Sequence, residues 1–267
     1  MGNLAAIAPV VELAAFWTDV SDSNIGRGLR AGAIAAIVWA SGDAVRANPF
    51  ELFRGSPDGQ VPAEQGVLLL GALDESGRPA IASETGFPGG VAVDTGAGNA
   101  IYAGYFNYNP LADTFINSEF PPLDRQMGFA VEFQVSLDRS TQNRGDRAGL
   151  SLTVISEDTL GIELGFEPDA IFAQSAIFDR AEAVAVNTQV LRNYELRVEG
   201  DRYQLFASDE LILSGQLRSY FFNPRRNTPP LLFDPYTTPG FVFLGDNTSS
   251  ESAMFVLTGI NIENDGS

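Results

Sequence analysis

The chain contains no cysteine, no histidine and no lysine among its 267 residues. Without cysteine there is no disulfide framework, and no thiolate can act as a nucleophile or a metal ligand. Without histidine there is no Ser-His-Asp triad, no imidazole zinc site and no histidine general base. The catalytic schemes that survive these absences rest mainly on carboxylates.

Positive charge is scarce as well. All 16 basic residues are arginine, and they face 34 acidic residues, so the formal net charge is −18 and the sequence pI is about 4.2. A field of this sign repels phosphate backbones and anionic lipids, so we expect no nucleic-acid partner. The acidity indicates either solubility in a salty medium or the binding of divalent cations by carboxylates.

Long hydrophobic runs are missing. The segment 26–44 places two arginines before a ten-residue apolar run that ends in small residues, an order typical of an export signal. Ten apolar residues cannot cross a bilayer, which needs about 20, so we expect no transmembrane segment. Residues 1–54 are predicted to be a short helical appendage, a leader, or the product of a mis-assigned start. A Pro/Gly/Asp-rich linker (54–62) separates them from a domain at 55–264.

Alternation with a period of two dominates that domain and predicts strands. The central hairpin lies within 147–174, where Leu150, Leu152 and Val154 alternate before a polar turn and Ile162, Leu164 and Phe166 alternate after it. Further alternating segments follow the same pattern: 67–73, 101–110, 128–138, 194–220, 241–245 and 253–263. A dozen short strands with regular turn signals predict an all-β, two-sheet antiparallel sandwich, and a closed barrel is the weaker alternative.

Several ordered blocks resemble the cyanobacterial choice-of-anchor secreted proteins, whose concanavalin A-like sandwich is related to laminin-G and lectin/glucanase domains. The blocks are RAGLS, GIELGFE and IFAQ, then YELRVEGDRYQLFASDELILSGQLRSY, then FVFLGDNTSSESA. The resemblance covers about residues 55–264. It implies a jelly-roll sandwich at the cell surface with no assigned chemistry, and it carries over no catalytic residue.

Glu163 and Glu167 form the main polar spacing, because they alternate with Gly165 on one face of a predicted strand. Glucanases of the concanavalin-like fold place a nucleophile and an acid on one strand face, with an aspartate between them, where this chain has Gly165. Four residues of strand separate the two α-carbons by about 13 Å, whereas hydrolysis needs carboxyl groups about 5–9.5 Å apart. We therefore expect solvated surface carboxylates that serve at most as weak ligand-binding groups.

Two other sets of residues are candidate sites. Tyr102, Tyr105 and Tyr108 could stack against sugar rings if exposed, but aromatic residues at such spacing are more often cross-strand packing.

Asp246, Asn247 and Glu251 offer oxygen ligands in the last predicted loop, which makes a weak Ca²⁺ site an open alternative to a simple turn. No other cofactor is expected.

Together these features predict a non-catalytic module outside the cell or on its surface, serving adhesion, glycan binding or envelope structure. Its partners would be glycans or other cell-surface components. Two alternatives stay open: a carboxylate-dependent glycoside hydrolase of the same fold and a structural assembly subunit. The sequence leaves the ligand and the oligomeric state undetermined.

Overall fold

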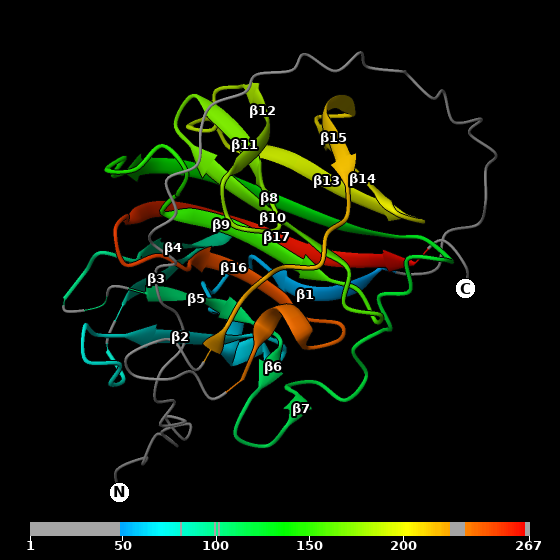
Figure 1. Cartoon of the computed structure of the whole chain (residues 1–267). Helices are drawn as coiled ribbons and strands as arrows, with labels where there is room; N and C mark the ends of the chain where they lie inside the picture. Colours follow the sequence, from blue (N-terminus) through cyan, green and yellow to red (C-terminus); the bar gives the residue numbers. More distant parts are fainter. Residues whose placement is uncertain (1–48, 81, 99, 101, 225–232, 265–267) are drawn as a thin grey trace, which may run out of the picture.

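The structure is a computed structural model, and it describes residues 49–80, 82–98, 100, 102–224 and 233–264. Within these residues the regular secondary structure is almost entirely β-strand (Figure 1). Residues 1–48 of the predicted appendage (1–54) lie outside the described residues. No helix in the described ranges is long and apolar enough to cross a membrane.

Two antiparallel sheets form the sandwich, and we name the first of them sheet A. Its central strands β8 and β17 pair over eleven positions, which makes them the longest pairing in the molecule. In spatial order, sheet A contains β15 (Glu210–Gln216), β14 (Arg202–Ala207), β13 (Arg192–Glu199), β8 (Phe129–Ser140), β17 (Ala253–Asn264), β4 (Gly90–Asp94) and β3 (Ser83–Phe87).

Sheet B packs against sheet A and contains the predicted central hairpin. In spatial order its strands are β12 (Arg180–Ala185), β11 (Ala170–Gln174), β10 (Gly161–Glu167), β9 (Leu150–Ile155), β16 (Val242–Asp246), β5 (Tyr102–Phe106) and β2 (Leu69–Leu73). A small hairpin of β6 (Tyr108–Asn109) and β7 (Thr114–Phe115) and two 3₁₀ turns, η1 (Pro62–Gln65) and η3 (Pro235–Thr237), complete the described elements. The predicted all-β two-sheet sandwich is confirmed.

One boundary differs from the prediction. Strand β1 (Phe50–Arg54) pairs with β17 at the side of sheet A, although the sequence placed these residues in the appendage. Leu52 and Phe53 are fully buried in the main core. The sandwich therefore begins before Gly55, because β1 contributes both backbone pairing and apolar side chains.

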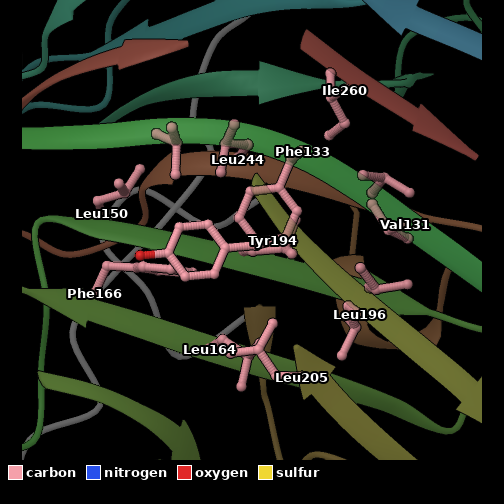
Figure 2. Packing of buried hydrophobic residues seen from close by; sticks show 14 of the residues in the cluster. Val131, Phe133, Leu150, Leu164, Phe166, Tyr194, Leu196, Leu205, Leu244 and Ile260 are labelled. Atoms are coloured by element: carbon pink, nitrogen blue, oxygen red, sulfur yellow. The ribbon is translucent and has the colours of Figure 1, made fainter. Parts of the chain in front are cut away.

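The main core fills the space between the sheets. Figure 2 shows Phe133 and Tyr194 from sheet A meeting Leu150 and Phe166 from sheet B. The rings of Phe133 and Tyr194 stack with centroids 5.3 Å apart, and Phe166 meets both of them edge-on at 5.9 and 5.6 Å. Alternation puts these side chains inside, so the residues between them along each strand face outward.

The outer face of sheet B is covered by a second apolar cluster. We call residues 217–224 and 233–240 the covering segment; Figure 1 shows it, gold to orange, passing over this sheet after β15. The cluster consists of Leu73, Tyr102, Phe106, Ile155, Phe178, Tyr220, Tyr236, Phe241 and Phe243. The two tyrosines of the covering segment lie with ring centroids 4.8 Å apart. This face of the sandwich is therefore part of the interior.

Candidate functional site

Glu163 and Glu167 lie on the outer face of sheet B, on the same side of β10, as the alternation predicts. They are not solvated, however, since their exposed fractions are only 3% and 7%. The prediction of surface carboxylates was wrong. Tyr220 and Tyr236 of the covering segment contact Glu163, and the Arg180 side chain contacts Glu167.

The carboxylate of Glu163 is held by side chains from two other parts of the chain. Tyr236 donates its hydroxyl hydrogen to Oε2 at 2.5 Å, and Asn247 donates from Nδ2 to Oε1 at 2.9 Å. The backbone N–H of Glu163 donates to the hydroxyl oxygen of Tyr220 at 2.7 Å. Burial raises the pKa of Glu163 because the charged form loses its hydration, and the two side-chain hydrogen bonds oppose this only in part.

Glu167 makes an ion pair with Arg180 at 2.9 Å, so its carboxylate has a structural partner. Between the two glutamates, the space above Gly165 is occupied by the ring of Phe172, which would lie 2.6 Å from a β-carbon added there. The Arg180 guanidinium covers the other part of that ring, 4.4 Å from its centroid. The place that a sugar would need between the two carboxylates is thus filled by protein.

The three predicted tyrosines do not form a platform. Tyr105 points into the main core, where it donates to Glu84 at 2.6 Å, and burial raises its pKa. Tyr102 is buried in the second cluster on the opposite side of the same strand. Tyr108 lies on β6, where partial burial and its hydrogen bond to Asp113 raise its pKa to about 12. Cross-strand and core packing accounts for two of them.

Asp246, Asn247 and Glu251 are brought near one another but point at different partners. The buried Asp246 carboxylate accepts hydrogen bonds from Thr248, and burial raises its pKa well above the usual range. Asn247 binds Glu163, and Glu251 accepts backbone N–H groups from residues 143 and 144 at 2.8 Å. Among the described residues, no group of three or more acidic side chains gathers closely enough to hold a metal ion.

An open polar cleft, which the sequence did not single out, lies on the outer face of sheet A. Its volume is about 240 Å³. The lining residues come from β8, β13, β14 and β17 and the turn after β14: Glu132, Phe133, Gln134, Asn193, Tyr194, Glu195, Phe206, Ser208, Asp209, Thr258, Gly259 and Asn261. The sequence signal is the polar half of the alternation in β8, which by itself predicts only the water-facing side of a strand.

Strand register sets the arrangement of the cleft. Glu132 lies directly opposite Glu195 on one side and Asn261 on the other. Two residues along β8, Gln134 lies between Asn193 and Gly259. Gly259 has no side chain, and an added β-carbon would meet only a backbone oxygen at 3.6 Å, so the sheet surface is hollow at this point.

Hydrogen bonds fix the side chains of the cleft but leave some polar atoms available. Gln134 donates to Asn193 at 2.6 Å and accepts from Thr258, while Asn261 donates to Glu132 at 3.2 Å. Within the described residues, the amide nitrogen of Asn193 and the amide oxygen of Asn261 have no partner.

At the rim, the side chains of Ser208 and Asp209 make no hydrogen bond or ion pair to the described part of the chain. The cleft therefore offers both donors and acceptors to a ligand. The ring of Phe206 adds an apolar surface to the same wall.

Comparison with solved structures places this architecture among known β-sandwiches. A carbohydrate esterase from the Shiga toxin-encoding bacteriophage phi24B matches 82% of this chain and 100% of its own, with a TM-score of 0.51 and 7% identity. A laminarinase from Rhodothermus marinus matches 83% of this chain and 99% of its own, with a TM-score of 0.47 and 11% identity. The exoplasmic/lumenal domain of VIP36, in a form bound to Ca²⁺ and Man₃GlcNAc, matches 78% and 87%, with a TM-score of 0.43 and 7% identity.

Likeness at these identities shows the fold alone. No protein-family description matches the sequence. A search of curated proteins finds no match either.

Proposed function

We propose that this chain is a non-catalytic β-sandwich module that binds glycans through the cleft on the outer face of sheet A. The observation that carries the proposal is the cleft itself: an open hollow beside an aromatic ring, in which the amide nitrogen of Asn193 and the amide oxygen of Asn261 have no partner among the described residues. Sugars present hydroxyl groups along their edges and C–H groups on their faces, so they need hydrogen-bonding groups and an apolar ring together.

The outer face of sheet B also supports placing the glycan site on sheet A, because its candidate carboxylates are not available to a ligand. On sheet B, Glu163 is buried and bound by Tyr236 of the covering segment, Glu167 is paired with Arg180, and Asp246 is fully buried. The volume of the cleft on sheet A, about 240 Å³, is just below the roughly 300–1,000 Å³ of pockets that enclose drug-sized ligands. It suits one or two sugar units of a longer chain.

The proposal includes the setting in which the module works. We place it outside the cell or on its surface, as a member of the choice-of-anchor type, where adhesion or envelope attachment would use the bound glycan. The sequence blocks that resemble those proteins and the strongly acidic composition support this placement. Binding in the cleft uses no metal in this proposal, and a weak Ca²⁺ site at Asp246, Asn247 and Glu251 stays a separate prediction.

A glycan array with and without Ca²⁺ tests the proposal, with one variant that fills the cleft. Gly259→Val adds bulk on a strand where an added β-carbon meets only a backbone oxygen, at an ordinary contact distance of 3.6 Å, so the fold should persist while glycan binding falls at least tenfold. Ser214→Val is the matched control, because it lies on the outer face of β15 in the same sheet but outside the cleft. Absence of any glycan ligand, or equal binding by Gly259→Val, would refute the proposal.

One observation favours the second candidate, a carboxylate-dependent glycoside hydrolase. Glu132 and Glu195 are directly opposed on neighbouring strands in the cleft, and opposed β-carbons are about 4.5–5.5 Å apart. Retaining hydrolysis uses carboxyl groups about 5–5.5 Å apart. The Glu195 carboxylate, however, is held by Arg197 through two contacts of 2.6 and 2.8 Å. Release of reducing ends from a bound glycan, lost in Glu132→Gln, would establish this candidate.

A further inference from the structure

We infer that the cleft on sheet A selects uncharged glycans and that the opposed pair Glu132 and Glu195 excludes those carrying carboxylate or sulfate groups. The inference rests on the proposed function and adds the class of ligand and the residues that set it. It starts from the register of β8 and β13, which places the two glutamates side by side in the cleft. Both side chains are partly exposed there, so a ligand would meet them.

Negative charge prevails among the described residues that line the cleft. They include three carboxylates, those of Glu132, Glu195 and Asp209, and no arginine. Lysine and histidine are absent from the whole chain, so arginine is the only side chain that could neutralise an anionic sugar. An anionic ligand would therefore enter beside carboxylates of the same sign.

Arg197, two residues along β13 from Glu195, is already engaged. Arg197 donates to both oxygens of Glu195, and its guanidinium lies over the ring of Phe206, 4.4 Å from the centroid. Turning toward a ligand would break a two-point ion pair and a cation–π contact at once. Arg197 thus orients Glu195 and supports Phe206 from outside the cleft.

The remaining polar groups fit hydroxyl-bearing ligands. The carboxylates accept hydrogen bonds and cannot donate them when ionised, and a sugar hydroxyl can supply the donor. The unpaired amide nitrogen of Asn193 is a donor for a sugar oxygen, and the amide oxygen of Asn261 is a further acceptor. A neutral polyol satisfies both kinds of group, whereas a uronate or sulfate brings further acceptors to a site rich in them.

Matched tetrasaccharides provide the test. Each pair shares its linkage and differs only in the carboxylate at C6: β-1,4-linked glucose against glucuronate, β-1,4-linked mannose against mannuronate, and α-1,4-linked galactose against galacturonate. Calorimetric titration of the whole chain in 20 mM NaCl should show the neutral member of a bound pair at least tenfold tighter. In 500 mM NaCl this ratio should shrink severalfold, because added salt screens partly exposed charges.

The variant Glu132→Gln assigns the selectivity to the pair. It keeps the shape of the side chain and an oxygen for Asn261 while removing the charge, so the neutral-to-uronate affinity ratio should fall at least threefold, whatever the change in the affinity for the neutral sugar. Asp138→Asn is the control, since it makes the same charge change on the same strand, about 20 Å away. Its ratio should equal that of the parent.

The outcomes separate the two proposals. If no tetrasaccharide and no arrayed glycan binds, the proposed function is wrong and the inference falls with it. If a uronate binds as tightly as its neutral partner or more tightly, the inference alone is overturned and glycan binding stands. A ratio that falls equally in Glu132→Gln and Asp138→Asn would assign the selectivity to the net charge of −18 and overturn the role of the pair.

Discussion

The hydroxyl of Tyr236 donates a hydrogen bond to the carboxylate of Glu163 at 2.5 Å, and both side chains are buried. This contact joins the covering segment to the middle of sheet B. It makes Glu163 an internal polar group whose partners lie 73 and 84 residues away in the chain. A residue that the sequence presents as a surface carboxylate is instead part of what attaches the covering segment to the sandwich.

The raised pKa of Glu163 gives stability a particular pH dependence. Because the folded state holds the proton more tightly than the unfolded state, the contribution of this group is full below about pH 4.5 and is lost as the pH rises toward the raised folded pKa. Glu163→Gln mimics the neutral form. Relative to the parent, its free energy of unfolding should therefore increase as the pH is raised from 4.5 to 8.

Urea denaturation at several pH values measures this difference, and Ser219→Ala, an exposed neutral residue of the covering segment, is the control that should give a flat line. A Glu163→Gln difference that is flat over the same range would contradict the raised pKa.

Gly165→Ala tests whether the space between Glu163 and Glu167 is filled. The new methyl group would lie 2.6 Å from a ring carbon of Phe172, which is fully buried, so the ring must move. We expect a loss of about 1–3 kcal/mol in the free energy of unfolding. Gly145→Ala, where an added β-carbon meets nothing within 4 Å, should change stability by about 0.5 kcal/mol at most. Equal stability of the two variants would mean that the space is open.

The first strand should be needed for stability. A chain that starts at Pro49 keeps β1, whereas one that starts at Gly55 loses the buried side chains of Leu52 and Phe53. Burial of each contributes about 1.5–3 kcal/mol, so the shorter chain should be less stable by about 3–6 kcal/mol. Thermal unfolding followed by circular dichroism compares the two. Equal melting temperatures would show that β1 is dispensable.

Arg125 links turns from both sheets. Its removal should lower the free energy of unfolding less at low pH than at neutral pH. It binds the Asp158 carboxylate at 2.6 Å, after β9 in sheet B, and donates to the Gly200 carbonyl at 2.9 Å, after β13 in sheet A. Its hydrogen bonds are the main cause that lowers the pKa of Asp158 to about 2. Because the folded pKa is lowered, this contribution is present above about pH 3.8 and is lost as the pH falls toward 2.

Arg125→Met should therefore destabilise the protein at pH 7 and differ less from the parent near pH 2. Asp158 is half exposed, so solvent screening limits the ion-pair part to about 1 kcal/mol or less. Guanidinium would screen this pair, so urea denaturation at pH 7, 4 and 2.5 is the suitable measurement. A penalty that grows toward low pH would contradict this assignment.

Alternation predicted the sandwich and most of its strands, because a two-sided sheet imposes a period of two on each segment. The strands that it missed include β1 and β12, for different reasons. Phe50–Arg54 is short and follows residues with a different pattern, and Arg180–Ala185 is an edge strand with three alanines, an arginine and a glutamate, which favour helices.

The sites were harder to predict. Alternation with a period of two shows on which face of a strand a residue lies, but it does not show which other segment covers that face. Glu163 is on the predicted face, but the covering segment that buries it follows more than fifty residues later. The cleft depends on register between distant strands: Glu132 meets Glu195 and Asn261 only after β8 has paired with β13 and β17. Neither pairing can be derived from the local sequence of β8.

Mapping a bound oligosaccharide onto the chain tests the central claim most directly. Backbone amide NMR shifts would be recorded during titration with a neutral oligosaccharide that binds in the array. The account predicts that the largest changes lie at Gln134, Asn193, Glu195, Gly259 and Asn261, on the outer face of sheet A. Changes centred instead on Glu163, Gly165 and the covering segment would contradict it, because they would place the ligand on sheet B.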